Sequence, residues 1–243
     1  LDRRTDPGIP KEQNRKKAQE ERKKELKKEV IEKYNLLEPP EEGVQRVWTD
    51  GSQQAGTDGQ QYAGYGAWFG EGHALNFSAP LQGNQQTNNR AEMMAAIEVL
   101  GLVPRTTELQ LCVDSQLVTD GATLWLAGWK RRGWKTKKGH TISNVDLWQR
   151  MDEEIQRRQA RQEWVKVPSH VELEGNEHAD KLADEGVRKH GVRLEADKKE
   201  KRPPAKRPER QQQLPEQPAK KRKRDRERES QEQDPNPNPQ PNP

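Results

Sequence analysis

The stretch VQRVWTDGSQQAGTDGQQYAGYGAWFGEGHALNFSAP, residues 44–80, decides the fold of this chain. It contains three runs rich in Val, Trp, Tyr and Phe, namely VQRVWTDGS, YAGYGAWFG and HALNFSAP, and each run is bounded by Gly, Asn, Asp or Pro. Apolar runs separated by turn-forming residues are typical of β-strands. We therefore predict three consecutive antiparallel strands in this stretch.

The sequence after Pro80 alternates between helical and extended patterns. Helix-capping residues precede apolar runs of helical spacing, and two shorter runs have the character of strands. The order of elements predicts a mixed sheet with helices packed on it. The expected elements are a helix from Asn88 or Asn89 to about Leu102, a strand at 108–114, a helix from Ser115 to about Trp129, a helix at about 144–161, a strand at 162–168 and a helix at about 176–190.

Composition places the folded part in the middle of the chain. Hydrophobic residues make up only 28% and charged residues 35%, which is too polar for one continuous core, yet all seven Trp lie between Trp48 and Trp164. We predict a charged helical or disordered arm at residues 1–43, a folded domain at 44–190, and a disordered basic tail rich in Pro and Gln at 191–243.

The charge distribution, the single cysteine and the lengths of the apolar stretches indicate where the protein is expected to reside. Residues 47–187 contain 14 Lys and Arg against 19 Asp and Glu, a net charge of −5, although six of the basic residues crowd into 130–138. Cys112 is the only cysteine, so no intrachain disulfide forms and an intracellular, reducing compartment is expected. No apolar stretch approaches the roughly 20 residues that cross a bilayer. The run Lys220–Arg224 fits a nuclear address, a polyanion contact or a solubilising tail, and otherwise a cytoplasmic location is expected.

Four carboxylates lie in distinctive strings: Asp50 in TDGS, Glu92 in TNNRAE, Asp114 in VDSQ and Asp180 in NEHADKLAD. The first and third end their predicted strands, and helical spacing puts Glu92 beside apolar residues. Each alone has an ordinary explanation, as a turn, a cap or a surface charge. Converging carboxylates repel by roughly 4 kcal/mol per pair at about 4 Å. Bound divalent cations would turn this cost into affinity, so together they predict a metal site.

Seven strings carry a resemblance to a known family: TDGS, TNNRAEMMAAIEVL, VDSQ, WKRRGWKT, NVDLWQRM, WVKVPSH and GNEHADKLAD. In this order, over about residues 46–188, they resemble type 1 ribonuclease H. The resemblance implies a ribonuclease H-like α/β fold, with a five-stranded mixed sheet of three antiparallel strands and then parallel additions, flanked by helices. It also implies an endonuclease that hydrolyses the RNA strand of RNA–DNA hybrids and leaves 5′-phosphate and 3′-hydroxyl ends.

The resemblance assigns catalytic and metal-binding roles by position. It implies that Asp50, Glu92, Asp114 and Asp180 are catalytic acids that hold two Mg²⁺ ions, with Mn²⁺ as an expected substitute. Hard divalent cations prefer oxygen ligands, so the residue types suit the role. His170 matches a catalytic histidine that assists proton movement or product release without binding the metal.

Substrate contacts are implied in the same way. Recognition of an RNA–DNA hybrid depends on the 2′-hydroxyl and on groove shape, which amide side chains suit. Cationic side chains would hold phosphates, with an affinity that falls steeply with salt. The implied contacts are Asn88, Asn89 and Gln116 in the minor groove, Thr87 and Asn144 at a phosphate of the DNA strand, and Lys130, Arg131, Arg132, Trp134 and Lys135 on a basic protrusion.

Two alternatives stay open. The first is the same domain cut from a retroelement polyprotein, which the start at Leu1 rather than Met favours and the basic protrusion disfavours. The second is a hybrid-binding module without catalytic activity, against which four intact acids argue. The expected partner is an RNA–DNA hybrid in each case, with no membrane. We expect a monomer, because no long apolar stripe remains after the sheet and helices take theirs.

Overall fold

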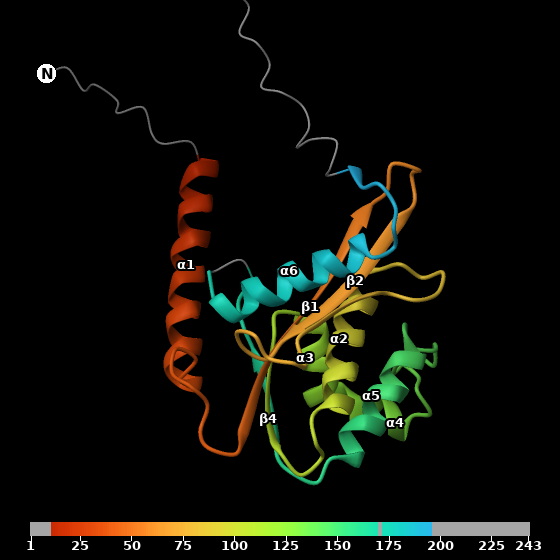
Figure 1. Ribbon diagram of the computed structural model, residues 1–243. Helices are drawn as coiled ribbons and strands as arrows, with labels where there is room; N and C mark the ends of the chain where they lie inside the picture. The colour runs from red at the N-terminus through yellow and green to blue at the C-terminus, as the bar shows by residue number, and fades with distance from the viewer. Residues whose placement is uncertain (1–10, 170–171, 196–243) are drawn as a thin grey trace, which may run out of the picture. The chain divides into compact units, whose positions relative to one another are not determined.

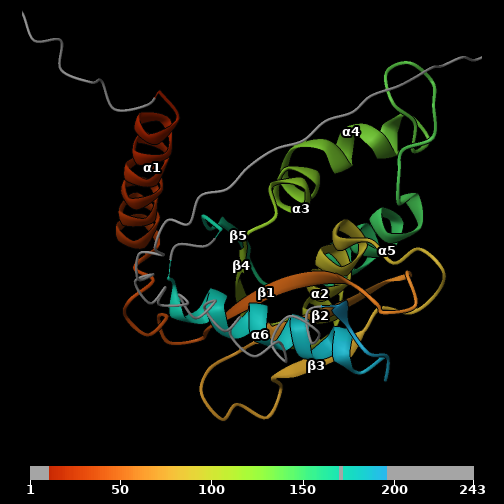
Figure 2. The ribbon, with the colours of Figure 1, turned by 90° about the horizontal axis from the view of Figure 1, so that it is seen from above.

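The computed structural model describes residues 11–169 and 172–195. His170 and the run Lys220–Arg224 therefore lie outside the described residues, as does nearly all of the predicted C-terminal tail. Figures 1 and 2 show the described elements from two directions.

The centre of the molecule is one five-stranded sheet in the order β3-β2-β1-β4-β5. Strands β1, β2 and β3 pair antiparallel, whereas β4 and then β5 add in parallel to β1. This arrangement confirms the predicted mixed sheet. The strands are β1 (Val44–Ala55), β2 (Gln61–Trp68), β3 (Phe77–Pro80), β4 (Glu108–Val113) and β5 (Gln162–Lys166).

Helices cover both faces of the sheet. Val47 on β1 packs in the core with α2 and α5, whereas Trp48, one residue later, packs on the opposite face near the start of α6. This alternation is the two-residue period of a strand. The helices are α1 (Lys11–Tyr34), α2 (Asn88–Leu102), α3 (Gln116–Asp120), the π-helical turn η1 (Gly121–Trp125), α4 (Leu126–Arg131), α5 (Val145–Arg157) and α6 (Glu174–Arg188).

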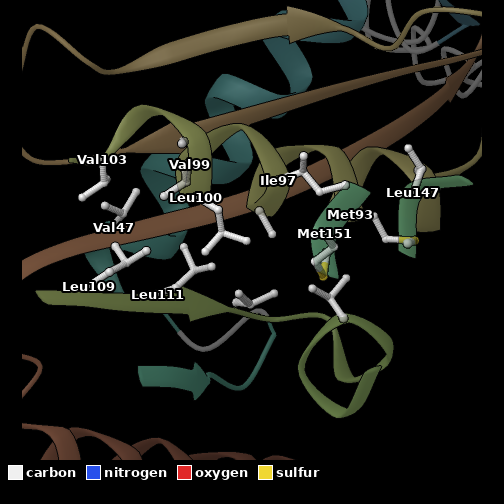
Figure 3. Close-up of a cluster of buried hydrophobic side chains, with 14 of the residues drawn as sticks. Val47, Met93, Ile97, Val99, Leu100, Val103, Leu109, Leu111, Leu147 and Met151 are labelled. Atoms are coloured by element: carbon white, nitrogen blue, oxygen red, sulfur yellow. The ribbon is translucent and has the colours of Figure 1, made fainter. Parts of the chain in front are cut away.

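The main hydrophobic core lies between β1, β4, α2 and α5 (Figure 3). Apolar residues of α2 recur at helical spacing on the side that faces the sheet, and they interlock with inward-facing residues of β4. Trp148 is 2% exposed and belongs to this core. Fully buried members include Val47, Met93, Ile97, Leu100, Leu109, Leu111 and Met151.

Helix α1 contacts the second face of the sheet. Val30, Ile31 and Tyr34 pack against a buried cluster that contains Trp48 and Leu36. Burial of apolar surface is the main stabilising term for such docking. The expected alternatives for residues 1–43 were a charged helical arm or a disordered arm, and the structure has a helix at Lys11–Tyr34.

Arg46 joins the end of α1 to the sheet. This buried guanidinium on β1 donates hydrogen bonds to the carbonyl oxygens of Tyr34, Asn35, Leu36 and Glu38, and to the side chain of Gln110 on β4. The last carbonyls of a helix have no partner within the helix, so a cation there satisfies them.

The division of the chain into an arm at residues 1–43, a folded domain at 44–190 and a tail at 191–243 stays a prediction.

Several expected boundaries were wrong. Asp50 lies in the middle of β1 instead of at its end, because β1 continues to Ala55 in a hairpin with β2. Thr87, and neither of the following asparagines, caps α2 through its side chain. Ser115 does cap a helix as expected, but η1 interrupts the helix after Asp120. Within residues 11–169 and 172–195, no helix has the length and apolar character to cross a membrane.

Candidate active site

Asp50 lies where the pairing of β1 changes. The parallel pairing of β1 with β4 ends at Thr49 and Val113, while its antiparallel pairing with β2 continues beyond Asp50, which lies opposite Gly66. No described residue pairs with β1 on the β4 side past this point. The Asp50 carboxylate accepts a hydrogen bond of 2.8 Å from the amide of Gly51. Asp50 is 6% exposed, and it lies in the part of β1 that no longer pairs with β4.

Glu92 reaches Asp50 because α2 crosses β1 at a glycine. A Cβ atom at Gly51 would overlap the backbone of Ala91 and Glu92, so only glycine permits this approach. Glu92 is 5% exposed, and its Oε1 accepts a hydrogen bond of 3.4 Å from Nδ2 of Asn88. A carboxylate buried among alanines needs a cation or a hydrogen-bond donor, so its position suits a metal ligand.

Asp114 follows the last residue of β4 and completes a cluster of three carboxylates. Carboxylate oxygens of Asp50, Glu92 and Asp114 all lie within 4.8 Å of one another. Nδ2 of Asn176, on α6, lies 3.5 Å from Oδ2 of Asp114. The residues come from β1, α2 and the end of β4, so three separate segments bring the acids together.

Asp180 joins the cluster from α6. Its carboxyl is within hydrogen-bonding reach of Asp50 and raises the pKa of that residue. Asp180 is itself exposed, and it lines a cavity of about 470 Å³ together with Asp50, Asp114 and Asn176. All four predicted acids are therefore neighbours.

Asp184, one turn after Asp180, holds α6 on the hairpin. It accepts hydrogen bonds from Oγ of Ser52 at 2.5 Å and from Nε2 of Gln54 at 2.7 Å. Glycines of β2 also let the helix lie close to the strands, since a Cβ at Gly64 would overlap the backbone of α6. These contacts orient the helix that carries Asp180.

The cluster has a strong electrostatic cost. Burial, and then the charge of Asp114, raise the pKa of Asp50 from 3.8 to about 8. Burial, and then the charge of Asp50, raise the pKa of Glu92 well above its usual value. Desolvation and like charges both disfavour ionisation, so the folded protein without a cation holds protons at this site.

This donor set fits a hard divalent cation. Among the described residues, no group donates a hydrogen bond to Oε2 of Glu92, although this atom is buried. An unpaired buried carboxylate oxygen costs free energy, and a metal ion would remove that cost. Clustered carboxylate oxygens are the ligands that Mg²⁺ and Mn²⁺ prefer. The residues present therefore fit the expected ions.

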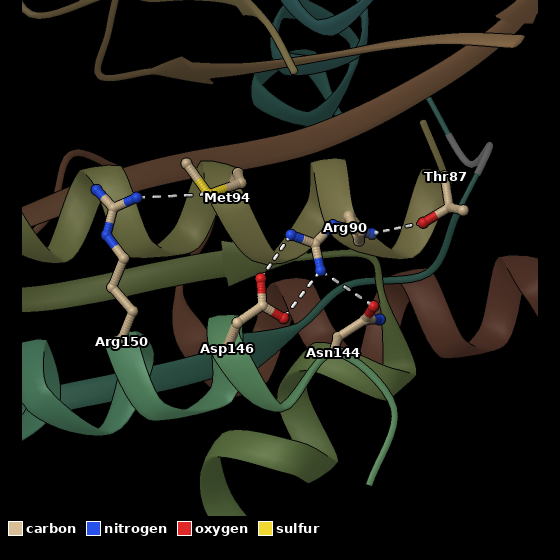
Figure 4. A network of polar contacts seen from close by, with 6 residues as sticks. All are labelled: Thr87, Arg90, Met94, Asn144, Asp146 and Arg150. Atoms are coloured by element: carbon tan, nitrogen blue, oxygen red, sulfur yellow. Dashed lines mark hydrogen bonds and ion pairs between the residues drawn. The ribbon is translucent and has the colours of Figure 1, made fainter. Parts of the chain in front are cut away.

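Arg90, which the sequence argument did not single out, connects two predicted phosphate contacts (Figure 4). Its backbone amide donates to Oγ1 of Thr87 at 3.4 Å, and its guanidinium donates to Oδ1 of Asn144 at 3.3 Å. Two further hydrogen bonds hold the same guanidinium to Asp146, at 3.0 and 2.7 Å. Asn144 has a positive φ of 55°. Thr87 and Asn144 thus both contact Arg90, although 57 positions separate them.

The three predicted amide contacts are exposed, and each lies within four residues of one of the acids along the chain. Asn88 and Asn89 form the exposed first turn of α2, and Gln116 forms the first turn of α3. Nε2 of Gln116 donates to Asp120 at 2.7 Å. The backbone amide of Asn88 donates to the side chain of Gln53, which links this turn to the end of β1.

The predicted protrusion consists of α4 and the loop after it. Arg131, Arg132 and Lys135 are exposed, whereas Trp134 is half-buried against the main core, with a positive φ of 64°. Lys130 differs from its neighbours, because its ammonium forms an ion pair of 2.7 Å with the buried Asp152 of α5.

Sequence reasoning also missed Gly51, Asn176 and Lys166. Lys166, at the end of β5, is half-buried, and its charge interacts with Asp114 and Glu92. Burial lowers the pKa of this lysine. Gly51 carried a usable signal, since it stands beside Asp50 in TDGS, but nothing local shows that α2 crosses there.

Three comparisons with known proteins agree with this geometry. The family model described as RNase H matches residues 42–188. The chain is similar to a ribonuclease H of Albidiferax ferrireducens, at 52% identity over 101 residues that cover 42% of this chain and 68% of the relative. It is also similar to a ribonuclease H of an Acidovorax species, at 48% identity over 101 residues that cover 42% and 68%.

Among solved structures, the chain resembles the foamy viral protease-reverse transcriptase in complex with RNA/DNA hybrid. The TM-score is 0.52 at 20% identity, and the match covers 59% of this chain and 20% of that chain. At this identity the likeness concerns the fold, and it agrees with the mixed sheet and flanking helices described above.

Proposed function

This chain belongs to the ribonuclease H family, and we propose that it hydrolyses the RNA strand of RNA–DNA hybrids with two Mg²⁺ ions. The observation that carries the proposal is the convergence of Asp50, Glu92 and Asp114, whose oxygens lie within 4.8 Å of one another. Family membership supports the substrate, and the donor set supports the ions. The products would be a 5′-phosphate and a 3′-hydroxyl.

The four acids would share the coordination of the two ions. Asp50 interacts with Glu92, Asp114 and Asp180, so it would share in holding both ions. Asp180 would complete one set of ligands, and Glu92 with Asp114 the other. When bound, the ions supply activation of the attacking water and stabilisation of the leaving oxygen. Mn²⁺ would substitute because it accepts the same oxygen ligands.

The chain's own residues would position the substrate around this site. Thr87 and Asn144, which Arg90 connects, would hold a phosphate of the DNA strand. The exposed amides of Asn88, Asn89 and Gln116 would read the minor groove, where the 2′-hydroxyl distinguishes RNA from DNA. His170 keeps its proposed accessory role, although it lies outside the described residues.

The protrusion would bind phosphates farther from the scissile bond. Arg131, Arg132 and Lys135 are exposed and are the stronger candidates. Lys130 would have to leave its ion pair with Asp152 to reach a phosphate. Trp134 would support the loop through its packing on the core and present one edge to the DNA strand.

A cleavage assay on a labelled hybrid tests the proposal. We expect cleavage with Mg²⁺, none with EDTA, and only RNA fragments with 5′-phosphates. The Asp114→Asn variant should keep hybrid binding and lose at least about 100-fold in turnover, because a neutral amide is a poor ligand for Mg²⁺. Binding without cleavage by the wild type would favour a module without catalytic activity. Wild-type turnover in Asp114→Asn would refute the role of that residue.

The monomeric state and the intracellular location, cytoplasmic or nuclear, stay predictions.

A further inference from the structure

One face of α1 packs on the domain and ends at the rim of the active-site cavity. Lys27, Val30, Ile31 and Tyr34 are half-buried, and their spacing of three, four and seven residues defines one side of a helix. The three apolar members pack on the buried cluster around Trp48. This side of α1 therefore faces the domain.

Lys27 marks where this packed face meets the active site. Its Nζ donates a hydrogen bond of 3.1 Å to the backbone oxygen of Glu172. Glu172 lines the same cavity of about 470 Å³ as Asp50, Asp114 and Asp180. The face of α1 that carries Lys27 thus reaches the rim of the cavity that holds the catalytic acids.

Two lysines continue this face beyond the rim. Lys23 and Lys24 precede Lys27 by four and three residues, so they lie on the same side of the helix. Both are exposed although that side is the packed one, which means that α1 extends past the surface of the domain here. Within the described part of the chain, neither lysine forms an ion pair. We call Lys23 and Lys24 the cationic overhang.

We infer that the cationic overhang binds the phosphate backbone of the nucleic acid where it leaves the active site. The inference deepens the proposed function, on which it rests for the presence of a hybrid at the carboxylates. Residues 47–187 carry a net charge of −5, so a polyanion needs cationic contacts outside the acidic parts of the domain. The protrusion supplies such contacts from α4 and the following loop, and α1 supplies a second set beside the cavity.

The charge of α1 as a whole agrees with this role. The helix contains 10 Lys and Arg against six Glu. Lys23 lies about 6 Å along the helix axis from Lys27 at 1.5 Å per residue. That distance is about two base pairs of a duplex, so the overhang would contact phosphates close to the cavity.

Salt-dependent binding of a hybrid tests the inference with a matched control. The test variant is Lys23→Gln with Lys24→Gln. The control is Arg15→Gln with Arg22→Gln, which removes the same charge from positions about 120° and 140° around the helix from Lys27. Glutamine has a helix propensity close to those of lysine and arginine, so α1 should persist in both. Circular dichroism checks that it does.

The readout is the affinity of the full chain for a hybrid of about 20 base pairs in EDTA, from about 50 to 200 mM salt. Two phosphate contacts contribute about 1.8 to the log–log slope, which is about 12-fold over this fourfold range. We expect the wild type and the control to lose about 12-fold more affinity than the test variant over this range. Equal slopes for the test and control variants, whether both change or neither does, would overturn the inference.

The same proteins separate this inference from the proposed function. If the wild type cleaves no hybrid with Mg²⁺ but the test variant alone has a reduced slope, the proposed function fails and the overhang stands as a nucleic-acid contact. If the wild type cleaves normally and the slopes are equal, the overhang fails and the proposed function stands.

Discussion

Replacing Asp50 with asparagine should make the metal-free protein more stable at pH 8, and the stability of the variant relative to the wild type should rise with pH from about pH 4. The pKa of Asp50 is raised from 3.8 to about 8, first by burial and then by the charge of Asp114. At 1.36 kcal/mol per pKa unit, this shift corresponds to at most about 6 kcal/mol of destabilisation at pH 8. Asparagine has the same shape and no charge to desolvate.

The pH window follows from the direction of the shift. Below about pH 4 the folded and unfolded chains both hold the proton, and Asp50 contributes little to the difference in stability. Between about pH 4 and pH 8 the unfolded chain releases the proton while the folded chain keeps it, so wild-type stability falls. The effect is complete above about pH 8.

Part of this gain is lost in the variant. The Oδ1 atom of asparagine can still accept the hydrogen bond from Gly51, but its amide nitrogen would be buried among carboxyl groups. An imperfectly satisfied amide costs about 1–3 kcal/mol. We therefore expect Asp50→Asn to exceed the wild type in stability by about 3–5 kcal/mol at pH 8 in EDTA, and to be less stable than the wild type by about 1–3 kcal/mol near pH 4, where only the cost of the amide remains.

Urea denaturation at several pH values, in EDTA and in Mg²⁺, measures this difference. Mg²⁺ should stabilise the wild type, by about 2.7 kcal/mol at a concentration 100-fold above its dissociation constant, and should affect the variant less. A variant that is no more stable than the wild type at pH 8 in EDTA would refute the argument that Asp50 is held in the fold at an electrostatic cost.

Two further predictions concern the supports of the site. Gly51→Ala should destabilise the protein by about 1–3 kcal/mol and reduce cleavage, because its Cβ would push α2 and Glu92 away from β1; denaturation and cleavage assays check this, and unchanged turnover would contradict it. Arg46→Ala should cost about 3 kcal/mol or more, because it removes the donor shared by four carbonyl oxygens at the end of α1. Urea denaturation measures that loss, and a cost under about 1 kcal/mol would show that α1 is held by its apolar contacts alone.

The elements of the fold could be predicted because their signals are local. Turn residues and apolar alternation marked β1, β2, β4 and β5, helical spacing marked α2, and the capping Ser115 marked the start of α3. Element ends were less predictable, since pairing partners decide them. Asp50 was expected to end its strand, yet β2 keeps β1 extended as far as Ala55.

The segment before the domain could not be predicted for a different reason. Residues 11–33 have many charges and few apolar side chains, so the pattern left a marginal helix or a disordered arm open. What holds α1 is the contact of its last turns with the cluster around Trp48, and the hydrogen bonds that Arg46 donates to the carbonyl oxygen of Tyr34, its last residue, and to those of the residues just after it. Neither contact is visible in a local pattern, because Arg46 lies 12 positions after Tyr34 on a separate strand.

By itself, the sequence determined the order of the elements, the four acids and the resemblance that carries the family, because these depend on short strings of residues. Only the tertiary structure decided that the acids meet. Glu92 comes from a helix on one face of the sheet, and Asp180 from a helix that crosses the other. They converge on Asp50 because β4 stops at Val113 and Gly51 lets α2 pass. Such convergence depends on distances between segments that no local pattern encodes.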